Sequence, residues 1–153
     1  MSELTRVTPK MQAATELLEC GLQMFFDGRY FAALHLAGAA DDVFGGYVIR
    51  GGTESAYESL KAGALRIAEY LDKDPEYRME GPPATEQGIA RVMNYARNRT
   101  KHLNSEGDDE ILFNPKREAK NLLRRALTNY YDLLSRLPLE ESEMMRRFNH
   151  ECS

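Results

Sequence analysis

The chain's strongest candidates for chemistry lie in one run of six residues, Arg97-Asn98-Arg99-Thr100-Lys101-His102. The run holds three cationic side chains and one imidazole, and it contains no acidic residue. A guanidinium binds phosphate bidentately and stays charged, while an imidazole titrates near neutral pH and can act as general acid or base. These residue types together indicate phosphoryl chemistry or phosphate binding. The structural alternative is a basic helix cap, because cations at a helix C-terminus meet the negative end of the dipole.

The spacing within this run limits how its members can meet. Arg97 and His102 are five residues apart, which is about 140° around an unbroken helix. Both can contact one phosphate only if the helix ends near Thr100–Lys101, or if a symmetric second copy of the chain supplies one of them. Asn98 and His102 are four residues apart and share a helical face, so the amide could orient the imidazole. We therefore expect a homodimer whose interface includes the end of this helix.

No metal-binding or phosphate-loop pattern accompanies the run. The three histidines are His35, His102 and His150, and none follows a glutamate at the Glu-x-x-His spacing of di-iron bundles. The sequence lacks His-Glu-x-x-His and Cys-x-x-Cys motifs. Neither Gly45-Gly46 nor Gly51-Gly52 is followed by the Lys-Ser/Thr of a P-loop. We therefore expect no dedicated metal site and no cofactor.

The elements that must position the run are helices. Thr8-Pro9 and Asn114-Pro115 each place an N-cap residue before a proline, which marks a helix start. Apolar residues recur at helical spacing, and no alternating Val/Ile-rich segment suggests a strand. Short loops between the first three helices favour antiparallel neighbours. The predicted fold class is therefore all-α, an up-and-down bundle of four to five helices. The predicted helices span residues 8–26, 29–49, 53–71, 85–102 and 115–137, followed by a short, loosely held helix over 140–148.

The helix over 29–49 is predicted to be central, because its many alanines and glycines let neighbouring helix axes approach closely. Asp41 and Asp42 within it are expected on the solvated face, since a core position would require a partner cation. The chain is predicted to form a single domain over residues 1–153, with a core at about 8–137 and a short C-terminal extension at 138–153. Two further helices are expected to bury apolar stripes, which are Tyr57, Leu60, Ala64, Ile67 and Leu71 in one and Ile89, Val92, Met93 and Ala96 in the other.

Composition indicates a cytoplasmic protein that does not enter a membrane. The chain has 153 residues, 42% of them hydrophobic, as expected for one globular domain. No apolar run approaches the roughly 18–20 residues of a membrane span, and the polar N-terminus has no signal-peptide core. Cys20 and Cys152 are therefore predicted to be reduced thiols. The net charge of −4 argues against binding to duplex nucleic acid, although 10 basic and 6 acidic side chains between residues 87 and 136 suit either a local anion site or a solvated helix face.

Two stretches on this helical background resemble the HEPN superfamily: Phe26-Asp27-Gly28-Arg29-Tyr30-Phe31-Ala32-Ala33-Leu34-His35-Leu36-Ala37-Gly38-Ala39-Ala40 and the late Arg97-Asn98-x3-His102. The resemblance covers roughly residues 8–137. It implies a four- to five-helix bundle whose signature is an arginine followed about four to six residues later by a histidine. Arg29-x5-His35 also fits that pattern, but its place at the start of a predicted helix favours an incidental match.

The resemblance implies two functions for the same residues, since many HEPN domains are metal-independent ribonucleases that act as homodimers and others only bind. In a ribonuclease, His102 would act as general base or acid, Arg97 would stabilise the phosphorane-like transition state, and Asn98 would orient the imidazole or a phosphate oxygen. Arg99 and Lys101 would bind the substrate. The alternative is a non-catalytic dimeric module that binds a nucleotide, RNA or a protein partner such as a cognate antitoxin. A purely structural bundle is the third interpretation.

Overall fold

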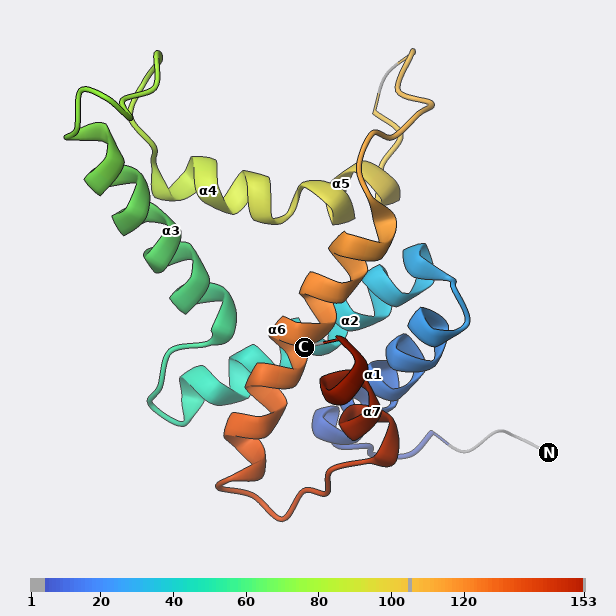
Figure 1. The fold of residues 1–153 in the computed structure, drawn as a ribbon. Helices are drawn as coiled ribbons and strands as arrows, with labels where there is room; N and C mark the ends of the chain where they lie inside the picture. The colour runs from blue at the N-terminus through green and yellow to red at the C-terminus, as the bar shows by residue number, and fades with distance from the viewer. Residues whose placement is uncertain (1–4, 105, 153) are drawn as a thin grey trace.

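The computed structural model describes residues 5–104 and 106–152, and these form seven α-helices and no strand (Figure 1). The predicted all-α bundle is therefore confirmed for the described residues. No helix among them is both long enough and apolar enough to cross a membrane. In chain order the helices are α1 (Lys10–Phe26), α2 (Tyr30–Arg50), α3 (Ala56–Asp72), α4 (Glu86–Met93), α5 (Tyr95–Lys101), α6 (Pro115–Leu134) and α7 (Glu143–Cys152).

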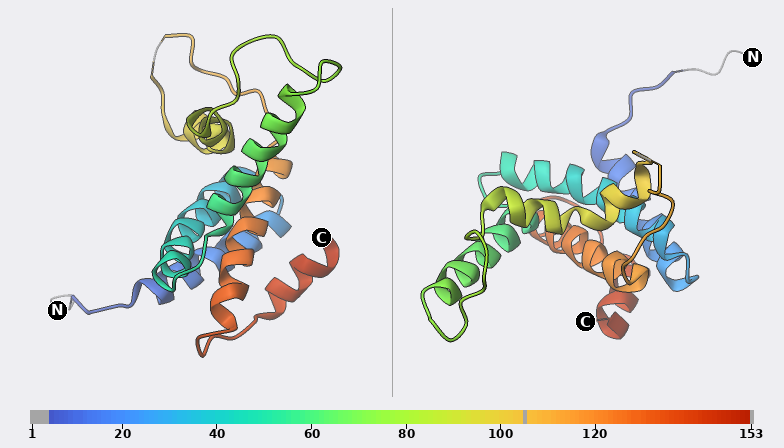
Figure 2. Two further views of the ribbon diagram at one scale, coloured as in Figure 1. Left: turned by 90° about the vertical axis from the view of Figure 1, so that its left-hand side faces the viewer. Right: turned by 90° about the horizontal axis from the view of Figure 1, so that it is seen from above.

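Helix α2 lies at the centre of the bundle, where it packs extensively against both α1 and α6 (Figures 1 and 2). Its small residues make this packing possible, because Ala33, Ala37 and Ala40 are all fully buried. A Cβ atom at Gly21 of α1 would lie 3.4 Å from the backbone nitrogen of Ala37, so the two helices leave little space between them. The prediction that small residues mark the central helix is confirmed.

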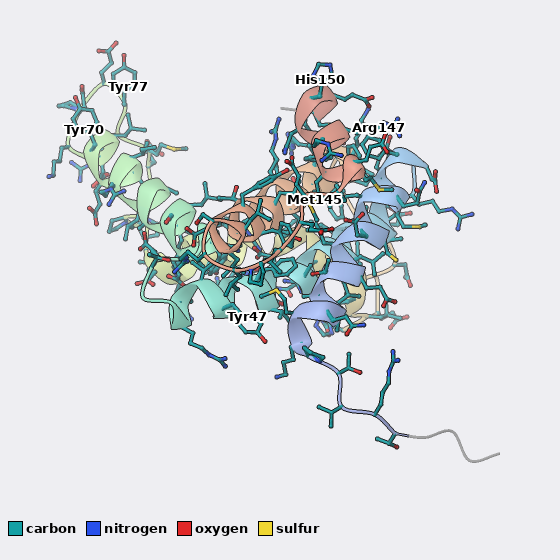
Figure 3. The ribbon with its side chains drawn as sticks, turned by 90° about the horizontal axis from the view of Figure 1, so that it is seen from below. Tyr47, Tyr70, Tyr77, Met145, Arg147 and His150 are labelled. Carbon is teal, nitrogen blue, oxygen red and sulfur yellow. The ribbon has the colours of Figure 1, made fainter. Side chains whose placement is uncertain are left out.

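Helix α7 is part of the hydrophobic core. Its buried residues are Met145 and Phe148, and the Phe148 ring packs edge-on against Phe25 of α1 at 5.5 Å between ring centres. Figure 3 shows Met145 toward the body of the bundle and His150 at the outer end of the helix. The short C-terminal helix predicted over residues 140–148 is therefore present but firmly packed, and the prediction that it is loosely held is wrong.

Helices α3 and α4 form an arm that stands away from the rest of the bundle (Figures 1 and 2). Neither helix contains a buried residue, and Leu60, Ile67 and Tyr70 are 55%, 63% and 74% exposed. Figure 3 shows Tyr70 and Tyr77 at the tip of this arm, far from α7. Apolar spacing groups residues on one face of a helix, yet it does not say whether another element covers that face. The core assignment is therefore wrong for Tyr57, Leu60, Ala64, Ile67, Leu71, Ile89, Val92 and Met93, and correct for Ala96.

The helix predicted over residues 85–102 is divided at Asn94, which ends α4 and begins α5. The Asn94 side-chain amide donates to the Ala90 carbonyl at 2.9 Å and to the Tyr57 hydroxyl at 3.2 Å. An amide side chain that bonds to the backbone in this way competes with helix continuation. The candidate residues consequently lie on a separate short helix, α5.

A buried ion pair joins α2 to α6. Asp41 and Arg125 are 3% and 7% exposed, and the Asp41 Oδ2 atom lies 2.8 Å from the Arg125 Nε atom. Asn129 donates to the other carboxylate oxygen at 2.9 Å, and it accepts a hydrogen bond from the backbone of Ala56 at 2.8 Å, at the start of α3. The predicted solvated position is correct for Asp42, which is exposed, and wrong for Asp41. The cation that a core position requires is Arg125, from the basic segment.

Candidate functional site

Arg97 of α5 lies across α2 in a notch left by Gly38. A Cβ atom at Gly38 would be only 2.6 Å from the Arg97 Cζ atom, so any side chain here would displace the guanidinium. Asp42, one turn further along α2, accepts a hydrogen bond from Arg97 Nη2 at 3.1 Å. The Arg97 side chain is 15% exposed. Arg97 therefore fixes α5 against α2.

His35, one turn before Gly38 on α2, makes the second contact with α5. Its Nε2 atom lies 2.6 Å from the Thr100 hydroxyl oxygen. The same hydroxyl lies 2.8 Å from the Ala96 carbonyl, and when it donates its single proton there it accepts from His35. In that arrangement His35 carries a proton on Nε2, and in the neutral ring the lone pair remains on Nδ1.

The surroundings of His35 favour its neutral form. Burial lowers the pKa of the imidazole below its ordinary value of 6.5, and the positive charges of Arg97 and Lys101 lower it further. At neutral pH the ring is consequently uncharged. A neutral, oriented imidazole is the form that accepts a proton in general-base chemistry.

Arg99 connects α5 to the loop that follows it. Its Nη1 atom lies 2.6 Å from a carboxylate oxygen of Asp108, and its Nη2 atom donates to the carbonyl of Glu110 at 3.2 Å. The Asp108 side chain also accepts from the backbone nitrogen of Asn104 at 3.2 Å. These contacts fold the loop back over the end of α5, so the loop forms one wall of the site.

His102 lies directly after the last residue of α5, Lys101, and has extended backbone angles of φ −129° and ψ 139°. The helix thus ends near Thr100–Lys101, which is where Arg97 and His102 of one chain would need it to end in order to contact one phosphate. Because His102 has left the helix, it no longer shares a helical face with Asn98, and the orienting contact expected between these two residues loses its basis. Asn98, Lys101 and His102 are all exposed.

One cavity of about 700 Å³ brings these groups together, between the first turns of α2, the end of α5 and the following loop. A volume in the range of roughly 300–1,000 Å³ is usual for a small-molecule site, so the volume is sufficient for a nucleotide in a cavity that is open to solvent. Of the five predicted site residues, Arg99, Lys101 and His102 line the cavity, whereas Arg97 and Asn98 do not. The polar lining is completed by His35, Thr100 and the acidic residues 108–110.

Sequence reasoning missed His35 as a site residue. The Arg29-x5-His35 pattern flags this histidine for the wrong reason, because Arg29 is exposed at the start of α2 and does not line the cavity. The contacts of His35 run instead to Thr100 on α5. Gly38 and Asp42 were also missed as the elements that hold Arg97. A glycine four residues before an aspartate on a central helix is the only signal that the sequence contains for them.

A second hollow, the α3–α6 groove, lies between α6 and the arm formed by α3 and α4, and its volume is about 940 Å³. Arg117 and Arg124 of α6 lie along the groove. A large apolar surface open to solvent marks a partner-binding site in many soluble proteins. The apolar part of the groove is contributed by Val48, Leu60, Ala64, Val92, Met93 and Leu122.

Comparisons with protein-family models, with curated proteins and with solved structures gave no match for this chain.

Within residues 5–104 and 106–152, no three His, Cys, Asp or Glu side chains gather closely enough to hold a metal ion. Cys20 is exposed, Cys152 is half-buried, and both are free thiols. Function must therefore be inferred from the geometry of the cavity itself.

Proposed function

We propose that this chain is a HEPN-like domain that binds RNA in the cavity beside α5 and cleaves it without a metal ion. The observation that carries the proposal is the presence of two imidazoles, His35 and His102, and two cations, Arg99 and Lys101, around one nucleotide-sized cavity. Metal-free cleavage of RNA needs a base for the 2′-hydroxyl, an acid for the leaving oxygen and positive charge at the phosphate. These four side chains supply all three.

Arg97 has a different role in this proposal from the one that its place in the motif implies. It is paired with Asp42 and seated against Gly38, and it does not line the cavity. Arg97 is therefore a positioning residue, which holds α5 so that the side chains further along the helix face the substrate. Arg99 and Lys101 take over contact with the phosphate.

A non-catalytic binding module is the second candidate, and one observation favours it. Arg99 already pairs with Asp108 at 2.6 Å, so a phosphate must displace a carboxylate before it gains the full charge of this guanidinium. A module of this kind would hold RNA or a nucleotide in the same cavity without turnover.

Binding and catalysis separate in a two-part assay carried out in excess chelator. Fluorescence anisotropy measures the affinity for a short labelled RNA, and gel electrophoresis follows its cleavage. Lys101→Ala should weaken binding several-fold and reduce the salt slope by about one. Lys73→Ala removes the same charge from the far end of α3 and is the matched control. Cleavage by wild type supports the nuclease, binding without cleavage supports the module, and the absence of both rejects each.

We also propose that the chain forms a homodimer through the α3–α6 groove. In the site proposed here Arg97 only positions α5, and Arg99, Lys101 and His102 line the cavity of one chain, so this site does not require a second copy at that helix end. The exposed stripe of α3, which includes Leu60 and Ile67, is the feature that needs a cover.

The occupant that fits the groove is α3 of a second copy. A helix of 17 residues is about 25 Å long, and its apolar stripe matches the apolar lining of the groove. The α6 wall carries both signs of charge, with Arg117 and Arg124 beside Glu118 and Asp132, so the match rests on the apolar stripe. Two-fold symmetry would place each α3 in the groove of the other copy. An amphipathic helix of an antitoxin-like protein is the competing occupant, and a monomer in solution would favour it.

A further inference from the structure

We propose that His35 is the general base and His102 the general acid for RNA cleavage in the cavity beside α5, an assignment that rests on the proposed function. His35 comes from α2, and His102 comes from the extended segment that follows α5. Both line the same cavity of about 700 Å³. In-line displacement at phosphorus needs its base and its acid on opposite sides of the phosphorus atom, and two residues from separate elements that line one cavity can take these positions.

The hydrogen bond between His35 and Thr100 occupies one ring nitrogen, Nε2. The Thr100 hydroxyl lies 2.6 Å from Nε2, and it accepts from this nitrogen when its own proton goes to the Ala96 carbonyl at 2.8 Å. This contact holds the ring in one orientation before any substrate arrives. The Nδ1 atom keeps the lone pair and is the atom assigned to take the proton of the ribose 2′-hydroxyl.

The charges that face His35 come from two elements besides its own helix. Four groups are cationic or titratable on α5 and just after it, and three are acidic in the loop that closes the cavity. Burial and the nearer cations keep the imidazole neutral at neutral pH, as a base must be. The groups are Arg97, which lies against α2, and, around the cavity, Arg99, Lys101, His102, Asp108, Asp109 and Glu110.

His102 differs from His35 in ways that suit the acid. It is exposed and lies on extended backbone beyond the end of α5, so its ring can follow a leaving group that moves toward solvent. Arg99 and Lys101, which precede it in sequence and line the same cavity, are assigned to hold the phosphate between the two imidazoles.

The reaction balances with these residues alone. His35 Nδ1 takes the proton from the 2′-hydroxyl, and the 2′-oxygen forms a bond to phosphorus. The bond between phosphorus and the 5′-oxygen breaks, and the protonated His102 gives its proton to that oxygen. The products are a 2′,3′-cyclic phosphate and a 5′-hydroxyl end, with His35 protonated and His102 neutral. Proton exchange with water restores both rings.

Two substrates distinguish the base from the acid. The first is a short RNA, and the second is a ribonucleoside 3′-(4-nitrophenyl phosphate), whose nitrophenolate leaves without a proton. Four variants are compared with wild type in excess chelator: His35→Ala, His35→Gln, His102→Ala and His150→Gln. His35→Gln keeps an amide donor for Thr100 but provides no base, and His150→Gln changes an exposed histidine on α7. Circular dichroism confirms the fold of each.

We expect His102→Ala to lose roughly 10²–10⁴-fold on RNA and to recover to within about tenfold of wild type on the nitrophenyl substrate. Both His35 variants should lose roughly 10²–10⁴-fold on both substrates, and the rate of His35→Gln should no longer fall on the acidic side of the pH profile. His150→Gln should match wild type.

Two results would overturn the assignment, and they point to different failures. Wild-type cleavage combined with an active His35→Gln variant would show that His35 only positions α5, while the proposed nuclease function survives. No cleavage of either substrate by wild type would reject the proposed nuclease function and this assignment together.

Discussion

The guanidinium of Arg97 occupies the space that a side chain at Gly38 would need, with its Cζ atom 2.6 Å from that Cβ position. The glycine therefore decides how closely α5 lies against α2. The pair between Arg97 and Asp42, at 3.1 Å, closes the same contact. Because α2 and α5 bound the cavity, the site depends on a residue that has no functional group of its own.

Gly38→Ala should displace the Arg97 guanidinium and break its pair with Asp42. We expect faster amide hydrogen exchange over residues 96–101, because α5 then loses its anchor on α2. Gly46→Ala is the matched control on the same helix, where nothing lies near the added methyl group, and it should stabilise the fold by about 0.5–1 kcal/mol. Unchanged exchange over α5 in the Gly38→Ala protein would show that Gly38 does not govern the contact.

Phe148→Ala tests whether α7 belongs to the core. The side chain is buried against Phe25, so its removal should lower the free energy of unfolding by about 3–5 kcal/mol in urea denaturation. His150→Ala, at an exposed position of the same helix, should change stability by less than about 0.5 kcal/mol. Similar stability of the two variants would mean that α7 packs loosely.

The stability of the protein should depend on pH through His35. Its pKa in the folded chain lies below the ordinary value of 6.5 because of burial and the charges of Arg97 and Lys101. At a pH between the pKa of His35 in the unfolded chain and its lower pKa in the folded chain, the unfolded chain binds the proton and the folded chain does not. Lowering the pH from about 6.5 toward the folded pKa therefore lowers the free energy of unfolding. Urea denaturation at several pH values should show a smaller loss for His35→Gln than for wild type. Equal losses would contradict the lowered pKa.

If two copies of the chain associate through the α3–α6 groove, acidic substitutions in the apolar stripe of α3 should dissociate the dimer. Replacing both Leu60 and Ile67 by Asp should convert the protein from dimer to monomer in sedimentation at micromolar concentration, because two carboxylates would be buried in the interface. Val7→Asp changes a fully exposed apolar residue outside the groove and should leave the dimer intact. A wild-type monomer at that concentration would refute the homodimer.

Local chemistry in the sequence predicts the helices well. Proline after Asn114 starts α6, and the small residues of α2 mark the central helix. The break at Asn94 was not foreseen, because the side chain that makes it bonds to Tyr57 on another helix as well as to its own. The apolar stripe of α3 was wrongly predicted to be buried for a related reason, because whether another helix covers that face depends on the path of the whole chain.

The candidate site was predictable in its residue types and less so in its partners. Arg99, Lys101 and His102 line one cavity, and the sequence groups them by their residue types within one short run. The roles of Arg97 and His35 could not be read in the same way. Each depends on a contact between α2 and α5, more than 50 residues apart in the chain, and a short motif contains no information on such contacts.

The most direct test of the metal-free nuclease is the identity of its products. Tag-free wild type and His102→Ala are incubated with a mixed-sequence RNA in excess chelator, and the fragments are identified by mass spectrometry. The proposal predicts 2′,3′-cyclic phosphate and 5′-hydroxyl ends from wild type, formed roughly 10²–10⁴-fold more slowly by His102→Ala. RNA left intact by wild type, or cleaved equally by both proteins, would contradict it.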